Sequence, residues 1–220
     1  MGDLPSAFQR AARVSRAMLY GTDHDHQLPR NLHHDARVPF LGFVGPAYRP
    51  GNPVLLAINP GGGGDAYVTR TPQDRELIPL IERFVAAPPE QLDRAFDDMC
   101  RSYAAQVRTW NLWRILGPTL AACRSDLDAA CYLNLFPYRT QGDKRPTTVP
   151  LRNAWTHIVD PLLKALAPGL LVALGKKAGG EAERYHRPPP PLFVVPRTIG
   201  DSSVSAEAQA VLATIRGLRR

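Results

Sequence analysis

The chain has 220 residues, of which 44% are hydrophobic, and this suits one domain of ordinary size with a buried core. It contains no apolar run of 18 residues, so it lacks a membrane span, and its start lacks the apolar region of a secretory signal. The net charge is +7 at pH 7, which favours an anionic partner, and nucleic acid is the commonest large one. An arginine-rich, high-GC proteome is the alternative source of this charge, since 23 of the 27 basic residues are arginine.

The three cysteines, Cys100, Cys123 and Cys131, form no C-x-x-C pair, so a zinc or iron–sulfur site is not expected. An odd number of thiols without a signal peptide indicates a reducing compartment. We therefore expect a cytoplasmic, monomeric protein that has no cofactor and no membrane contact.

The N-terminal part, residues 1–38, reads as a helix over 4–19 followed by a polar loop that is rich in histidine. The spacing of the histidines in this loop matches no metal-ligand pattern. We therefore expect a solvated loop, which can fold over the edge of the core where the candidate active site lies. The histidines are His24, His26, His33 and His34. Residues 39–53 form a short apolar segment broken by glycine and proline, which leads into the core.

Strand and helix patterns alternate through the remaining chain. Thr71, Pro72 and Asp74 mark a helix start, because they suit the N-cap, the first helical position and the helix dipole. The expected strands are 54–58, 131–134, 170–175 and 192–196, and the expected helices are 71–86, 89–107, 109–123, 149–166, 175–185 and 205–218. This order predicts one α/β domain over 1–220, with a three-layer α/β/α core at 39–218 and a four-stranded, mainly parallel sheet.

The stretch VLLAINPGGGG, residues 54–64, joins a buried strand to Asn59 and a run of glycines. Open α/β sheets place their chemistry at the carboxyl ends of their strands. Glycines let backbone N–H groups approach a ligand closely, although they also serve where a chain only turns. The other strands end at Asn134, at Gly175 and at Arg197, so the fold rule places all four ends around one cleft.

Four segments at these strand ends resemble, in the correct order, the motifs of the uracil-DNA glycosylase superfamily. They are AINPG (57–61), YLNLFP (132–137), LVALGKKAG (171–179) and VPRTIGDSS (195–203). The Asn-Pro-Gly form is closest to the mismatch-specific and single-strand-selective branches. The resemblance covers roughly residues 39–218 and implies the family's three-layer fold around a parallel sheet.

The resemblance also implies roles for single residues. Asn59 falls where the family orients the attacking water, and Asn134 falls where it reads the Watson–Crick edge of the base. Gly61 stands where the strict uracil enzymes have a tyrosine, which implies a wider pocket. Arg197 replaces the family's last-motif histidine, and Ser202 or Ser203 falls near its phosphate-binding serine.

Chemical considerations add further candidates. The backbone of Gly61 and Gly62 can line the pocket, and Tyr67, or as second choice Phe136, can stack on a base extruded from DNA. Arg197 can donate to the base oxygen, to the leaving anion or to a phosphate, or be a plain surface arginine. Asn134 can equally be a strand-end cap. The expected phosphate contacts, besides the two serines, are Lys144, Arg145, Lys176 and Lys177.

These features predict a hydrolase that removes uracil or a related damaged base from single-stranded or mismatched DNA. Asn59 cannot act as a general base, so slower chemistry than with an aspartate is expected. Two alternatives stay open: a non-catalytic protein that binds DNA or a damaged base, and a hydrolase of free nucleosides or nucleotides. A phosphate-transferring P-loop is disfavoured, because Asp65-Ala66 follows the glycines where that loop needs Lys-Ser/Thr.

Overall fold

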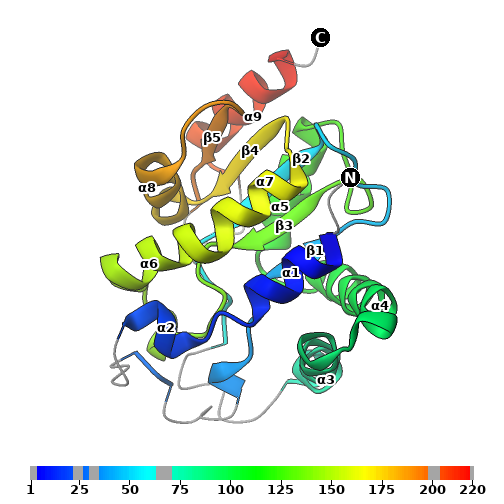
Figure 1. The fold of residues 1–220 in the computed structure, drawn as a ribbon. Coiled ribbons are helices and arrows are strands. Elements are labelled where there is room, and N and C mark those ends of the chain that lie inside the picture. The colour runs from blue at the N-terminus through cyan, green and yellow to red at the C-terminus, as the bar shows by residue number, and fades with distance from the viewer. Residues whose placement is uncertain (1–3, 22–26, 30–34, 63–70, 198–203, 219–220) are drawn as a thin grey trace.

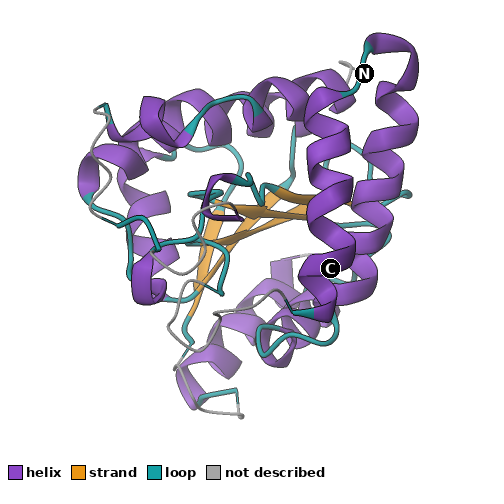
Figure 2. Ribbon diagram, turned by 90° about the horizontal axis from the view of Figure 1, so that it is seen from below, coloured by secondary structure: helices purple, strands orange, loops and turns teal. Residues whose placement is uncertain are grey.

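The computed structural model describes residues 4–21, 27–29, 35–62, 71–197 and 204–218. It shows an α/β fold with a five-stranded mixed sheet in the order β1-β3-β2-β4-β5 (Figure 1). Helices lie on both sides of the sheet (Figure 2). The predicted α/β class is confirmed, whereas the predicted number of strands is too small by one.

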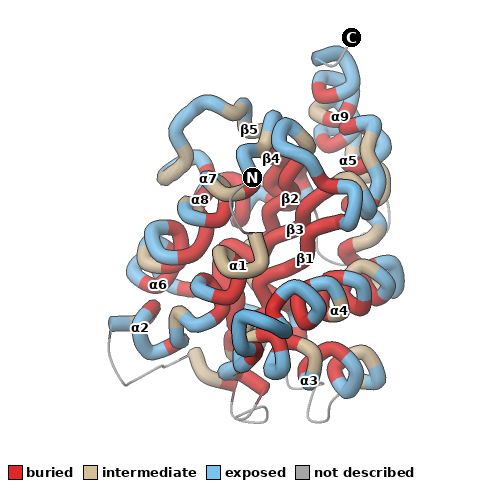
Figure 3. The backbone as a smooth tube through the Cα atoms, turned by 45° about the vertical axis from the view of Figure 1, so that its right-hand side comes forward, coloured by how far each residue is buried: buried red, intermediate tan, exposed pale blue. Residues whose placement is uncertain are grey.

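The four predicted strands form the parallel part of the sheet. They are β2 (Pro53–Ala57), β3 (Cys131–Asn134), β4 (Leu170–Leu174) and β5 (Leu192–Val195). The strands β2, β3 and β4 are buried along their whole length, as expected of a parallel sheet covered on both faces (Figure 3). Because all four run in one direction, their carboxyl ends share one edge of the sheet.

The fifth strand, β1 (Gly42–Val44), pairs antiparallel with β3 at the end of the sheet. It lies in the segment 39–53, where glycine and proline interrupt the apolar pattern of the sequence. Gly42 has a φ of +127°, and a Cβ at this position would lie 1.9 Å from the carbonyl oxygen of Tyr132. The glycine therefore permits a close approach of two strands rather than ending one.

The predicted N-terminal helix is two helices. Helix α1 (Leu4–Ala12) ends before Ser15, which accepts a hydrogen bond from the backbone N–H of Met18 at 3.2 Å and so caps α2 (Arg16–Tyr20). Apolar periodicity continues across the break, which is why the sequence reads as one helix. The break turns α2 onto α6 (Thr148–Ala154), whereas α1 packs on α7 (Asp160–Leu166).

The remaining helices largely follow the prediction. Thr71 and Asp74 form a capping box at the start of α3, while α5 begins four residues later than expected. A π-helical turn at Trp155–Val159 joins α6 to α7, just before Pro161, in the helix expected over 149–166. The bounds are α3 (Pro72–Ala86), α4 (Pro89–Val107), α5 (Trp113–Ala122), α8 (Lys176–Tyr185) and α9 (Ala206–Leu218).

The helices hold the sheet through one continuous core. Helix α4 packs on β1, α8 packs on β4 and β5, and α9 packs on β5 and α5.

In the parts of the chain that the structure describes, no helix has both the length and the apolar character needed to cross a bilayer. The three cysteines are buried free thiols.

Four buried tyrosines are expected to resist ionisation at high pH. Burial raises the pKa values of Tyr48, Tyr103, Tyr132 and Tyr138 above the ordinary value of 10.0. Because the unfolded chain ionises near pH 10 and the folded chain above it, their contribution to stability is constant below pH 10 and falls as the pH rises further. An alkaline titration followed by tyrosinate absorbance should show these four groups ionising only together with the loss of helical circular dichroism. Gradual ionisation of all tyrosines near pH 10 in the folded protein would contradict it.

Candidate active site at the carboxyl edge of the sheet

The strand ends bring Asn59 and the chain after β3 together. The pairing of β2 with β3 continues past the strands, since Leu135 N–H donates to the carbonyl of Ala57 at 2.8 Å and Phe136 N–H to that of Ile58 at 3.0 Å. Asn59 is therefore the first residue after β2 that lies beyond this ladder. It is half-buried and faces the segment that follows Phe136.

The side-chain amide of Asn59 has a defined orientation. Its Nδ2 donates to Thr140 Oγ1 at 2.8 Å, and Thr140 Oγ1 donates to the carbonyl of Lys144 at 2.5 Å. A threonine hydroxyl has a single proton, so the bond to Lys144 leaves it only an acceptor for Asn59. The amide nitrogen of Asn59 must therefore face Thr140. Its Oδ1 accepts no hydrogen bond from the residues that the structure describes and is available to a water or ligand.

The glycine turn after Asn59 rests on a buried arginine. Arg139 Nε donates to the carbonyl of Gly61 at 2.9 Å. Gly62 has a φ of +91°, and a Cβ there would lie 2.9 Å from the guanidinium carbon of Arg139. At least one glycine of this run is thus required both by its backbone conformation and by the arginine packed beneath it.

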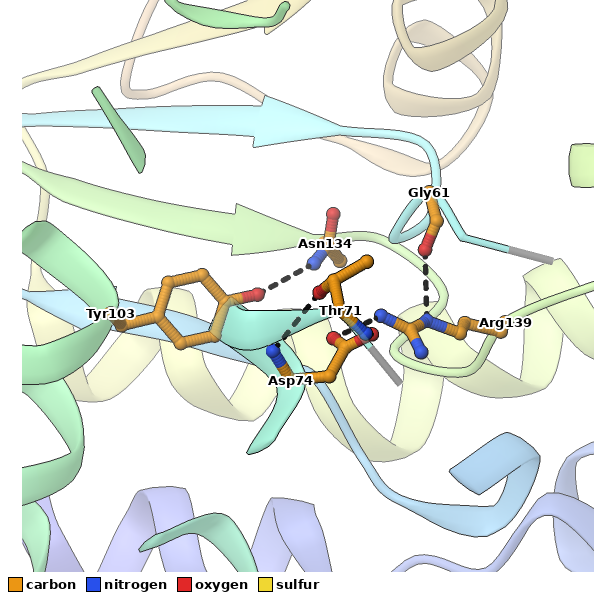
Figure 4. A network of polar contacts seen from close by, with 6 residues as sticks. All are labelled: Gly61, Thr71, Asp74, Tyr103, Asn134 and Arg139. Atoms are coloured by element: carbon orange, nitrogen blue, oxygen red, sulfur yellow. Dashed lines mark hydrogen bonds and ion pairs between the residues drawn. The ribbon is translucent and has the colours of Figure 1, made fainter. Parts of the chain in front are cut away.

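Arg139 in turn pairs with Asp74 at the start of α3. Its NH2 lies 2.6 Å from Asp74 Oδ1, and the side chains are only 7% and 9% exposed (Figure 4). Its guanidinium also lies 4.6 Å from the ring centroid of Phe40. The third guanidinium nitrogen, NH1, is buried and has no hydrogen-bond partner among the described residues. The pair joins the chain after β3, the turn after β2 and the N-terminus of α3.

Asn134 lies at the same edge, but its amide points into the protein. The residue is 1% exposed; its Oδ1 accepts from the Tyr132 hydroxyl at 3.0 Å, and its Nδ2 donates to the carbonyl of Phe40 at 2.8 Å. A longer contact of 3.5 Å joins Nδ2 to the Tyr103 hydroxyl. These bonds fit the strand-end cap that the sequence left open. The base-reading role stays a prediction, and it requires a ligand to exchange with these partners.

Arg197, two residues after β5, is exposed and lies next to Gly175 at the end of β4; a Cβ on Gly175 would lie 3.6 Å from that of Arg197. Burial raises the pKa of Tyr132, and the charge of Arg197 opposes part of this rise. Arg197 places a cation after β5, beside the end of β4.

The other predicted contacts differ in how available they are. Phe136 is fully buried against Tyr20 and Tyr138, so in this arrangement it does not face a base. Arg145 pairs with the buried Glu181, and the exposed Lys176 pairs with Glu207 at 3.0 Å. Lys144 and Lys177 are exposed.

Several predicted residues lie outside the described part of the chain. They are the stacking candidate Tyr67, the serines Ser202 and Ser203, and the four histidines His24, His26, His33 and His34. Among the described residues, no group of three or more His, Cys, Asp or Glu side chains is placed to hold a metal ion.

Three features that shape the edge were not predicted: Arg139, Thr140 and the pairing role of Asp74. Arg139 and Thr140 follow the YLNLFP segment after one residue, at the carboxyl end of β3. That position is the only signal in the sequence, because Asp74 lies 65 residues from Arg139. A search of protein-family models and a search of curated proteins found no match to this chain.

Proposed function

We propose that the chain is a DNA glycosylase-like hydrolase of the uracil-DNA glycosylase type, with a three-layer fold of that kind. Its reaction is hydrolysis of the N-glycosidic bond of uracil or a related damaged base. The water oxygen bonds to the sugar C1′ and the bond from C1′ to the base nitrogen breaks. The base leaves with the electron pair, and the water gives up one proton to solvent, because Asn59 cannot accept it. The observation that carries the proposal is the fixed amide of Asn59. Its Oδ1 accepts no hydrogen bond from the described residues and can accept one from the attacking water at the strand edge.

The charges at the edge support an anionic substrate. The departing base carries negative charge in the transition state, so a nearby cation lowers the barrier. Arg197 is exposed after β5, beside Gly175 at the end of β4, and no acidic partner is described for it. The exposed Lys144 and Lys177 stand on the segments that leave β3 and β4, where they can contact phosphates. The arrangement fits a base held over the edge and a backbone that runs along its rim.

A base-release assay on the full chain tests the proposal. We expect uracil to be released from single-stranded DNA or from a mismatched duplex, and not from free deoxyuridine. DNA binding should weaken steeply with added salt, because Lys and Arg contacts release counterions from the phosphates. Tight binding without release would support the non-catalytic alternative, whereas cleavage of the free nucleoside with little salt dependence would support the second one. The proposal would be refuted if the chain neither bound these substrates nor released a base from them.

A further inference from the structure

We infer that Arg139 is a positioning residue, which holds the turn after β2 so that the amide of Asn59 keeps its water-accepting orientation. The catalytic part of this inference rests on the proposed function. The structural part, that Arg139 determines the state of the Asn59 side chain, can be tested without any activity.

Arg139 and its neighbour Thr140 hold both ends of one short segment. Thr140 accepts a hydrogen bond from the side chain of Asn59. Arg139 Nε donates to the carbonyl of Gly61, which is two residues after Asn59. The two holding residues are adjacent in the sequence, so one stretch of main chain after β3 carries both contacts. Moving the guanidinium releases the carbonyl of Gly61. Among the described contacts, only the side chain of Asn59 then ties the chain beyond Ile58 to the segment after β3.

The guanidinium has little freedom to move. Asp74 Oδ1 holds its NH2, the Phe40 ring lies against it, and the backbone of Gly62 covers it so closely that a Cβ would clash. Its own carbonyl accepts from Arg16 NH1, which fixes the main chain at the same residue. Asp74 is itself fixed, because its Oδ2 accepts from Thr71 N–H at 3.3 Å in the capping box.

The cost of this arrangement indicates that it does more than fill space. A charged pair is buried, and NH1 keeps its N–H groups away from water without an acceptor among the described residues. Uncharged side chains of similar volume often replace a buried ion pair with little change in stability. A neutral pair can therefore keep the fold and still lose the hydrogen bond to Gly61, which separates positioning from stability.

The test compares the wild-type chain with the double variant Arg139→Met/Asp74→Asn, in which the asparagine introduced at position 74 keeps an oxygen for Thr71 N–H. Arg139→Lys is a second variant, which keeps a charge for Asp74 but has no Nε–H for Gly61. A matched control, Arg83→Met/Asp98→Asn, removes an exposed ion pair that joins α3 to α4. The readouts are the side-chain amide NMR signals of Asn59, assigned by their loss in Asn59→Ala, and single-turnover base release with DNA affinity.

In the wild type and in the control, we expect two distinct side-chain amide protons for Asn59 that exchange slowly with solvent. Either Arg139 variant should exchange them at least about 10-fold faster, and should lower the single-turnover rate about 10- to 100-fold with DNA affinity unchanged, as for a group displaced by about 1 Å. A folded Arg139 variant with wild-type amide signals overturns the inference. If the wild type releases no base, the proposed function fails, and the amide signals still decide the role of Arg139.

Discussion

Asp74→Ala is expected to lower the free energy of unfolding by about 3–5 kcal/mol, because it leaves the charge of Arg139 buried without a counter-charge. Arg139 would then have two buried guanidinium nitrogens without acceptors instead of one, counted among the described residues. The same substitution removes the Asp74 half of the capping box at the start of α3. Urea unfolding followed by circular dichroism measures the loss.

The partner substitution, Arg139→Met, should cost less. Asp74 keeps the hydrogen bond from Thr71 N–H and the favourable end of the α3 dipole, so its carboxylate is not left wholly unpartnered. The neutral double variant Arg139→Met/Asp74→Asn should recover part of the stability that Asp74→Ala loses. The exposed pair of Arg83 and Asp98 serves as control and should contribute no more than about 1 kcal/mol. Equal losses for Asp74→Ala and for disruption of the exposed pair would show that the buried pair has no special role.

Asn59→Ala is expected to lower the single-turnover rate of base release about 100-fold or more, since an unheld water must find its position by chance. DNA affinity should stay within about two-fold, because Asn59 is neutral and the salt-dependent part of binding comes from lysine and arginine. Base release at saturating protein, together with a separate binding titration, measures the two quantities.

Two controls define how the amide acts. Thr140→Val removes the hydroxyl that fixes the amide and should reduce the rate less than Asn59→Ala, because the amide oxygen remains but can turn away. Asn52→Ala removes another half-buried asparagine, at the opposite end of β2, whose Nδ2 donates to the carbonyl of Ala129, and should leave the rate unchanged. A wild-type rate in Asn59→Ala would exclude the water-orienting role.

The parallel part of the fold could be predicted because its signals are local. A run of apolar residues such as Val54–Leu56 can only be buried, and Thr71 and Asp74 form their cap within one helical turn. The strand β1 could not be predicted, because Gly42 is needed for contact with Tyr132, 90 residues away, and in the sequence looks like an interruption.

The candidate site divides in the same way. The position of Asn59 at the edge of the sheet was predicted, because a polar residue that follows a buried strand must lie there. The inward direction of the Asn134 amide depends on Tyr132 and on the carbonyl of Phe40, and the role of Arg139 depends on Asp74. Phe40 and Asp74 lie far from their partners in the sequence. Tyr132 is on the same strand as Asn134, but nothing in the sequence shows that its hydroxyl binds the amide.

The bond from Thr140 to the carbonyl of Lys144 connects two tasks in one short loop. The side chain of Lys144 is exposed, and under the proposed function it contacts a phosphate. Its main-chain oxygen accepts the only hydroxyl proton of Thr140 and thereby sets the orientation of the Asn59 amide. Under the proposed function, Lys144 would then both bind a phosphate with its side chain and orient the Asn59 amide through its main-chain oxygen. A shift of this loop on docking would be transmitted to the water through two hydrogen bonds, without movement of the sheet.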